Sequence, residues 1–87
     1  MKTLNEEQRG RLVEVLNEKL HTTTPKEIAD IVGLSFGTIH TLSKGVMKHV
    51  PEGATLAICK NLSINPYYVL EGTMPKYLDW RKVFSGY

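Results

Sequence analysis

The chain has 87 residues, which is enough for one hydrophobic core but too few for a catalytic cleft with a separate lid. Hydrophobic residues make up 41% of it and charged residues 23%, which excludes a disordered or collagen-like protein. The formal charge of +2 permits nucleic-acid binding but does not by itself indicate it. Cys59 is the only cysteine, so there is no internal disulfide, and no apolar stretch has the length of a signal peptide or a membrane span. We therefore expect a cytoplasmic protein with no membrane partner.

Two overlapping N-cap patterns open the first predicted helix: Thr3 is followed by Glu6, and Asn5 by Gln8. Apolar residues then recur at helical spacing and form one stripe, made of Leu12, Val13, Leu16 and Leu20. Glycine within a helix costs roughly 1 kcal/mol relative to alanine. Because Gly10 lies in the first turns, we expect the firm part of this helix to begin at about Arg11.

The clearest helix start in the sequence is Thr24-Pro25-Lys26-Glu27, which combines an N-cap threonine, an N1 proline and an N3 glutamate. This second helix ends at Gly33, because glycine tolerates the positive φ of a helix C-terminus. Ser35 then serves as the N-cap of a third helix, predicted over about residues 35–44, and the pair Lys44-Gly45 closes it.

Two helices of about eight residues joined by only three, 33–35, must cross at a steep angle, which is the helix-turn-helix arrangement. Ala29 supplies the small side chain needed where the two helices meet. Ile39 and Leu42 are placed to anchor the third helix to the core. The opposite face of that helix is then exposed.

A fourth helix is predicted around Ala54, Leu56, Ala57, Ile58 and Leu62, with apolar residues on more than one side and Cys59 in its core face. This pattern is typical of a central, buried helix. Asn65-Pro66 then begins a short fifth helix that stops at Gly72. We expect an all-α, five-helix domain over residues 1–72, followed by a short C-terminal extension over residues 73–87.

The stretch TPKEIADIVGLSFGTIHTLSKG resembles the lambda-repressor-like, Cro-related (Xre) helix-turn-helix family of phage and bacterial transcriptional regulators. A Pro-containing loop before the helix Ala54 to Asn61, and Ser63-Ile64-Asn65-Pro66 before the closing helix, extend this resemblance over roughly residues 8–72. The resemblance implies a compact lambda-repressor-like domain that binds double-stranded DNA with its third helix in the major groove.

The resemblance also implies which residues contact DNA. Ser35, Lys44 and Lys48 are placed for phosphate contact. The positions that match the family's base contacts carry Phe36, Gly37, Thr38, His40 and Thr41.

The chain departs from the family pattern at two points. Many relatives begin the second helix with a glutamine that touches phosphate, and here that position is Pro25. The reading face also lacks the arginine, glutamine or asparagine that makes bidentate base contacts, which leaves Phe36 to meet a thymine methyl group and His40 to meet a guanine. We therefore expect sequence specificity that is modest or partly based on DNA shape.

Several of these residues also have a purely structural interpretation, without a role in binding. Phe36 either contacts a partner or pads the helix end, and Gly37 either allows a close approach to the backbone or reflects drift. The histidines and Cys59 lack the paired short spacing of zinc ligands, and no nucleophile has a base and an oxyanion site at a recognisable spacing. We expect no metal, no cofactor and no catalytic activity.

Aromatic residues cluster near the C-terminus and recur at helical spacing, at Tyr77, Trp80, Phe84 and Tyr87. Such a stripe either packs back on its own domain or forms a dimer interface, where aromatic residues are enriched. We favour dimerisation, because a lone helix-turn-helix reads only one short half-site.

Together these features predict a homodimeric repressor or Cro-like switch protein that binds a pseudo-palindromic operator. The alternative is that the helix-turn-helix serves as a protein-interaction module, for example in an anti-repressor that binds another regulatory protein. The weak reading face and the modest charge keep this alternative open.

Overall fold

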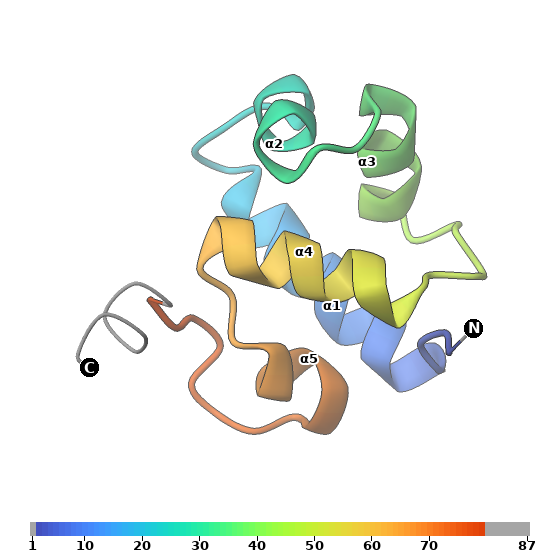
Figure 1. The fold of residues 1–87 in the computed structure, drawn as a ribbon, viewed down its shortest axis with the longest axis vertical. Coiled ribbons are helices and arrows are strands. Elements are labelled where there is room, and N and C mark those ends of the chain that lie inside the picture. Colours follow the sequence, from blue (N-terminus) through green and yellow to red (C-terminus); the bar gives the residue numbers. More distant parts are fainter. Residues whose placement is uncertain (1, 80–87) are drawn as a thin grey trace.

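The structure is a computed structural model and describes residues 2–79. These residues form an all-α fold whose helices are α1 (Glu6–Lys19), α2 (Pro25–Val32), α3 (Phe36–Ser43), α4 (Glu52–Leu62) and α5 (Pro66–Glu71). The pair α2 and α3 lies at one end of the molecule and α5 at the other, while α1 and α4 run between them (Figure 1). The predicted number and order of helices are confirmed for the described part of the chain.

Capping side chains fix where three of the helices begin. Thr24 accepts a hydrogen bond from the Glu27 backbone N–H at the start of α2, and Ser35 accepts one from Thr38 at the start of α3. The Asn65 side chain does the same for the Tyr67 N–H at the start of α5. All three N-cap predictions are confirmed, because each cap satisfies a backbone donor that the first helical turn leaves without a partner.

The expectation for the start of α1 is wrong, because the helix begins at Glu6 rather than near Arg11. The Asn5 side chain accepts from the Gln8 N–H at 2.9 Å, and the Gln8 side chain accepts from the Asn5 N–H at 2.8 Å. This reciprocal capping box outweighs the cost of Gly10. The competing cap, Thr3, instead forms an isolated β-bridge with Pro51, on the loop before α4.

Each helix contributes buried side chains to one core. On α1 these are Leu12, Val15 and Leu16, and on α4 they are Thr55, Ile58, Cys59 and Leu62. The expectation that α4 is a central, buried helix holds for one face only, since the apolar Leu56 on its other face is 39% exposed. Cys59 lies in the core as predicted, and burial raises the pKa of its thiol to about 12.

The prediction of a helical aromatic stripe is wrong at Tyr77, which lies in an extended segment and forms a β-bridge with Ile64. The Lys76 carbonyl accepts from the Asn65 N–H at 2.9 Å, and the Leu78 N–H donates to the Ser63 carbonyl at 2.9 Å. These long-range backbone bonds decide the conformation, and helical periodicity cannot reveal them. The other three residues of the predicted stripe, Trp80, Phe84 and Tyr87, lie outside the described residues.

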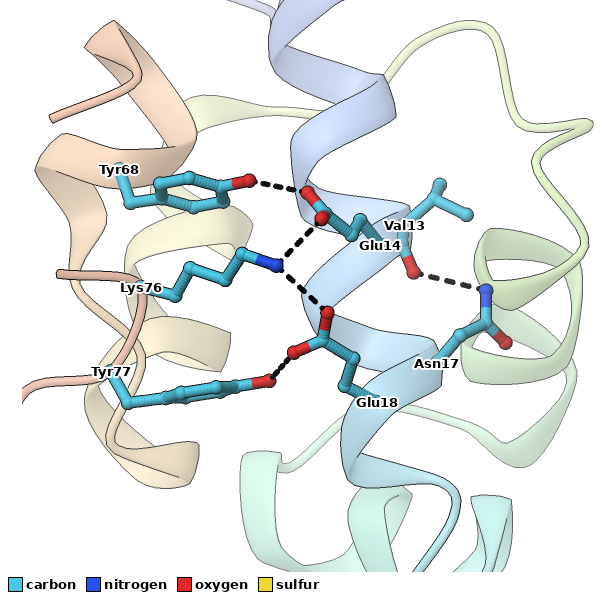
Figure 2. A network of polar contacts seen from close by, with 7 residues as sticks. All are labelled: Val13, Glu14, Asn17, Glu18, Tyr68, Lys76 and Tyr77. Carbon is cyan, nitrogen blue, oxygen red and sulfur yellow. Dashed lines mark hydrogen bonds and ion pairs between the residues drawn. The ribbon is translucent and has the colours of Figure 1, made fainter. Parts of the chain in front are cut away.

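The segment that follows α5 is bound to α1 by a polar cluster (Figure 2). The Lys76 ammonium lies 2.8 Å from a Glu14 carboxylate oxygen and 3.0 Å from one of Glu18. The Tyr68 hydroxyl donates to Glu14, and the Tyr77 hydroxyl donates to Glu18. Residues 76–78 therefore pack on the domain that was expected to end at residue 72.

These contacts shift the titration of both carboxylates. The hydrogen bond from Lys76, and then that from Tyr68, hold the pKa of Glu14 below its ordinary value of 4.5. For Glu18 the hydrogen bond from Tyr77 has the largest effect on the pKa, followed by that from Lys76. Both carboxylates are thus stabilised in the ionised form when the chain is folded.

The free energy of unfolding should fall as the pH is lowered from 4.5 through the depressed pKa values of Glu14 and Glu18. Their contribution is fully present above the ordinary pKa and is lost once both are protonated. Chemical denaturation from pH 6 to pH 3 measures the slope, which should be shallower in the variant Glu14→Gln/Glu18→Gln. Asp30→Asn, which removes an exposed carboxylate on α2, is the control. Equal slopes in the double variant and the wild type would contradict the assignment.

Gly33→Val and Ala29→Glu should each destabilise the domain severely. Gly33 has a φ of +76°, where a β-branched residue is strained, and Ala29 is only 4% exposed, so a glutamate there buries a charge. We expect a loss of more than about 2 kcal/mol for the buried charge. Gly10→Ala lies in a helical position where an added Cβ would meet no other element of residues 2–79 within 4 Å, so it should instead raise stability. Thermal melts that rank the three variants otherwise would refute this account of the α2–α3 turn.

Candidate nucleic-acid interface

The turn between α2 and α3 determines which face of α3 is exposed. The Ala29 carbonyl accepts from both the Gly33 N–H at 2.9 Å and the Leu34 N–H at 3.1 Å, so the chain leaves α2 abruptly. Two residues then anchor α3 to the core, since Ile39 and Leu42 are 0% and 2% exposed. The opposite side of α3 is consequently left on the surface, beside α2 (Figure 1).

Most of the predicted DNA-contacting residues lie together on that side of α3. The exposed ones are Ser35, Phe36, Gly37, His40 and Lys44. Residues three and four apart on a helix are surface neighbours, so these positions form one continuous face. We call it the α3 face.

The two threonines lie at the margin of the α3 face. Thr38 and Thr41 are half-buried. Lys48 is exposed on the loop that leaves the C-terminal end of α3. The structure therefore brings seven of the eight predicted residues onto one short helix and its two cap positions, and Lys48 onto the loop that follows.

Some of the hydroxyls near this face already have partners. Ser35 Oγ accepts from the Thr38 N–H at 3.1 Å, and the Ser35 and Thr38 hydroxyls are hydrogen-bonded to each other at 2.8 Å. Within residues 2–79 the His40 ring and the Thr41 hydroxyl make no hydrogen bond. His40 and Thr41 are thus the polar side chains of α3 best able to bond to a partner.

An exposed aromatic pair occupies the N-terminal half of the α3 face. The rings of Phe36 and His40 are stacked, with centroids 5.7 Å apart and planes inclined by 13°. Phe36 is 53% exposed, although a phenylalanine buries a large apolar area when it has a partner. The pair is therefore an apolar contact surface rather than part of the core.

The segment that carries α3 is positively charged. Between Asp30 and Glu52 the chain contains Lys44 and Lys48 and no carboxylate side chain. Neither lysine forms an ion pair within the part of the chain that the structure describes. Both ammonium groups are consequently available to neutralise an anionic partner.

The position of α3 also depends on Asn17 of α1, which the sequence analysis missed. Its side-chain amide donates to the Ser43 carbonyl in the last turn of α3 at 2.9 Å. It also donates to the Val13 carbonyl at 3.0 Å, the bond that Figure 2 shows. The available signal was an asparagine, a poor helix former, at the edge of the apolar stripe of α1. This contact ties the C-terminal end of the α3 face to the longest helix of the domain.

Residues 2–79 contain no group of three His, Cys, Asp or Glu side chains that could hold a metal ion. None of the helices between these residues has the length and apolarity needed to cross a bilayer. The α3 face therefore remains the candidate site.

Comparisons with protein-family models, with curated proteins and with solved structures find no match to this chain. The resemblance to the lambda-repressor-like family consequently rests on the residue pattern described above.

Asn17→Ala should lower the free energy of unfolding by about 1 kcal/mol, because it removes the interhelical hydrogen bond to Ser43. Asn61→Ala is a matched control, since the Asn61 amide bonds only to the carbonyl of Ala57 on its own helix. Amide exchange should accelerate at Ser43 and Lys44 in the first variant alone. Equal exchange in both variants would show that Asn17 does not hold α3.

Proposed function

We propose that this protein is a sequence-specific DNA-binding transcriptional regulator that inserts α3 into the major groove. The observation that carries the proposal is the α3 face itself. It is an exposed helix surface next to a tight turn from α2, with Lys44 and Lys48 near its C-terminal end and no carboxylate from residue 31 to residue 51. A helix of this kind has the diameter that the major groove admits.

The lambda-repressor-like domain is part of this proposal. It is supported by the order of the five helices, by the cap at Ser35 and by the left-handed turn at Gly33. In such a domain the first helix of the pair crosses the DNA backbone while the second reads base edges. Phosphate contacts from Lys44 and Lys48 would supply much of the affinity, and His40 and Thr41 would contribute hydrogen bonds to bases.

A homodimer on a pseudo-palindromic operator belongs to the same proposal. One α3 helix reads only a few base pairs, so a single domain would have little specificity. The aromatic residues proposed for the dimer contact are Tyr77, Trp80, Phe84 and Tyr87. Tyr77 is 37% exposed and already hydrogen-bonded to Glu18, so only its remaining ring surface is available to a second copy.

A protein-interaction module, such as an anti-repressor, is the second candidate. The exposed apolar residues Phe36, Ile31 and Val46, which are 53%, 53% and 66% exposed, favour it. Such residues are enriched in the centre of protein interfaces, where charge is depleted. The lysines favour DNA instead, and salt dependence separates the two, since only release of counterions from phosphates gives a steep logarithmic slope.

Selection of bound duplexes from a random pool should enrich an inverted repeat. On the best site, His40→Ala and Thr41→Ala should each cost roughly 1 to 3 kcal/mol while leaving non-specific binding unchanged. Lys44→Ala should weaken binding to the best site and to non-specific DNA alike. It should also reduce by about 1 the slope of log affinity against log salt concentration. Lys60→Ala, an exposed lysine on α4, is the control and should change neither.

Shift assays at several salt concentrations measure all four variants against the selected site and a random duplex. If His40→Ala, Thr41→Ala and Lys44→Ala lose the same affinity on both duplexes, α3 does not read bases. If no DNA sequence is enriched and the affinity for DNA does not depend on salt concentration, the DNA-binding proposal is refuted and the protein-interaction module is favoured.

A further inference from the structure

Gly37 is a glycine that the fold does not require. It lies at the second residue of α3, has no positive φ, and an added Cβ would meet no atom of residues 2–79 within 4 Å. Gly33, by contrast, needs its left-handed conformation to turn the chain. Glycine lowers helix stability relative to alanine, so at Gly37 the domain loses stability without any gain in packing.

The surroundings of Gly37 distinguish it from the other helical glycines. Gly10 and Gly53 are also exposed and unconstrained, but they lie on α1 and α4, outside the α3 face. Gly37 lies in the α3 face, three residues before His40 and four before Thr41, so both are its neighbours on the helix surface. The apolar ring of Phe36, stacked on the His40 ring, lies beside it. Because Gly37 has no side chain, we expect the helix surface there to be lower than at these rings and at Thr41. We call this position the low point of the α3 face.

We infer that this low point is where a base edge approaches α3 most closely, and that it takes the 5-methyl group of a thymine. This inference rests on the proposed function. It attributes part of the sequence specificity of DNA binding to the lack of a side chain at Gly37. The thymine methyl is the apolar group that base pairs present in the major groove. The apolar group beside the low point is the Phe36 ring, and the Ser35 and Thr38 hydroxyls on the same helical turn are bonded to each other.

The inference predicts that stability and binding respond in opposite directions to one added methyl group. Gly37→Ala should raise the melting temperature, because alanine favours the helix and no atom of residues 2–79 obstructs the Cβ. Its affinity for the selected duplex should fall about tenfold, the loss expected from overpacking a close contact. Affinity for a random duplex should be unchanged, since Lys44 and Lys48 are intact. Gly10→Ala is the matched control and should raise the melting temperature with no change in either affinity.

A second measurement identifies the group that is contacted. Each thymine of the selected duplex is replaced in turn by deoxyuridine, which removes only the methyl. Wild type should lose about fourfold in affinity at one position of each half-site, the change expected for burying one methyl-sized group. Gly37→Ala should show no further loss at that position, because the contact is already gone.

The outcomes separate this inference from the proposed function. If selection enriches a sequence but Gly37→Ala binds it as well as wild type does, the close approach at Gly37 is refuted while DNA reading by α3 stands. If Gly37→Ala loses affinity but no deoxyuridine position is sensitive, or if its sensitive position remains, the thymine assignment is refuted. If selection enriches nothing, the proposed function and the inference fail together.

Discussion

The left-handed turn at Gly33 is the constraint from which the candidate site follows. Two successive N–H groups converge on the Ala29 carbonyl, so α2 ends and α3 begins within three residues. The small side chain of Ala29 lets the helices meet there. With so short a connection, Ile39 and Leu42 can enter the core only if the opposite face of α3 points outward. The exposed aromatic and basic residues of α3 are a consequence of that turn.

Helix α1 supports both ends of the molecule. Its Arg11 and Gln8 side chains donate to the Val69 and Leu70 carbonyls in the last turn of α5, at 2.9 and 3.1 Å. Asn17, further along the same helix, donates to the last turn of α3. Each bond satisfies a carbonyl that a helix C-terminus leaves without a partner. The orientation of α3 is therefore coupled to the helix that also carries the polar cluster with Lys76.

The chemistry of the α3 face suits a partner that offers negative charge next to flat or apolar groups. Lys44 and Lys48 provide charge, whereas Phe36 and His40 provide a stacked ring surface without bidentate hydrogen-bonding groups. Duplex DNA combines phosphates with base edges and methyl groups in one groove. In the DNA-binding function proposed above, such a face would gain specificity from shape and apolar contact more than from strong polar pairing.

The sequence by itself determined the features that depend on neighbouring residues. The caps at Thr24, Ser35 and Asn65 and the glycine helix ends were all readable, because they involve backbone groups within a few residues of each other. The periodicity also placed Ile39 and Leu42 inward, and so the α3 face outward. What only the tertiary structure decided involves residues far apart in the chain.

The extended path of residues 76–78, their charge cluster with α1 and the bond from Asn17 to α3 join segments separated by 11 to 62 positions. Tyr77, the first residue of the helically spaced aromatic series, lies in an extended segment instead of a helix. The backbone hydrogen bonds of its neighbours to Ser63 and Asn65 are more favourable there than a local helix. Such pairings depend on which surfaces meet after collapse, and no short window of sequence contains both partners.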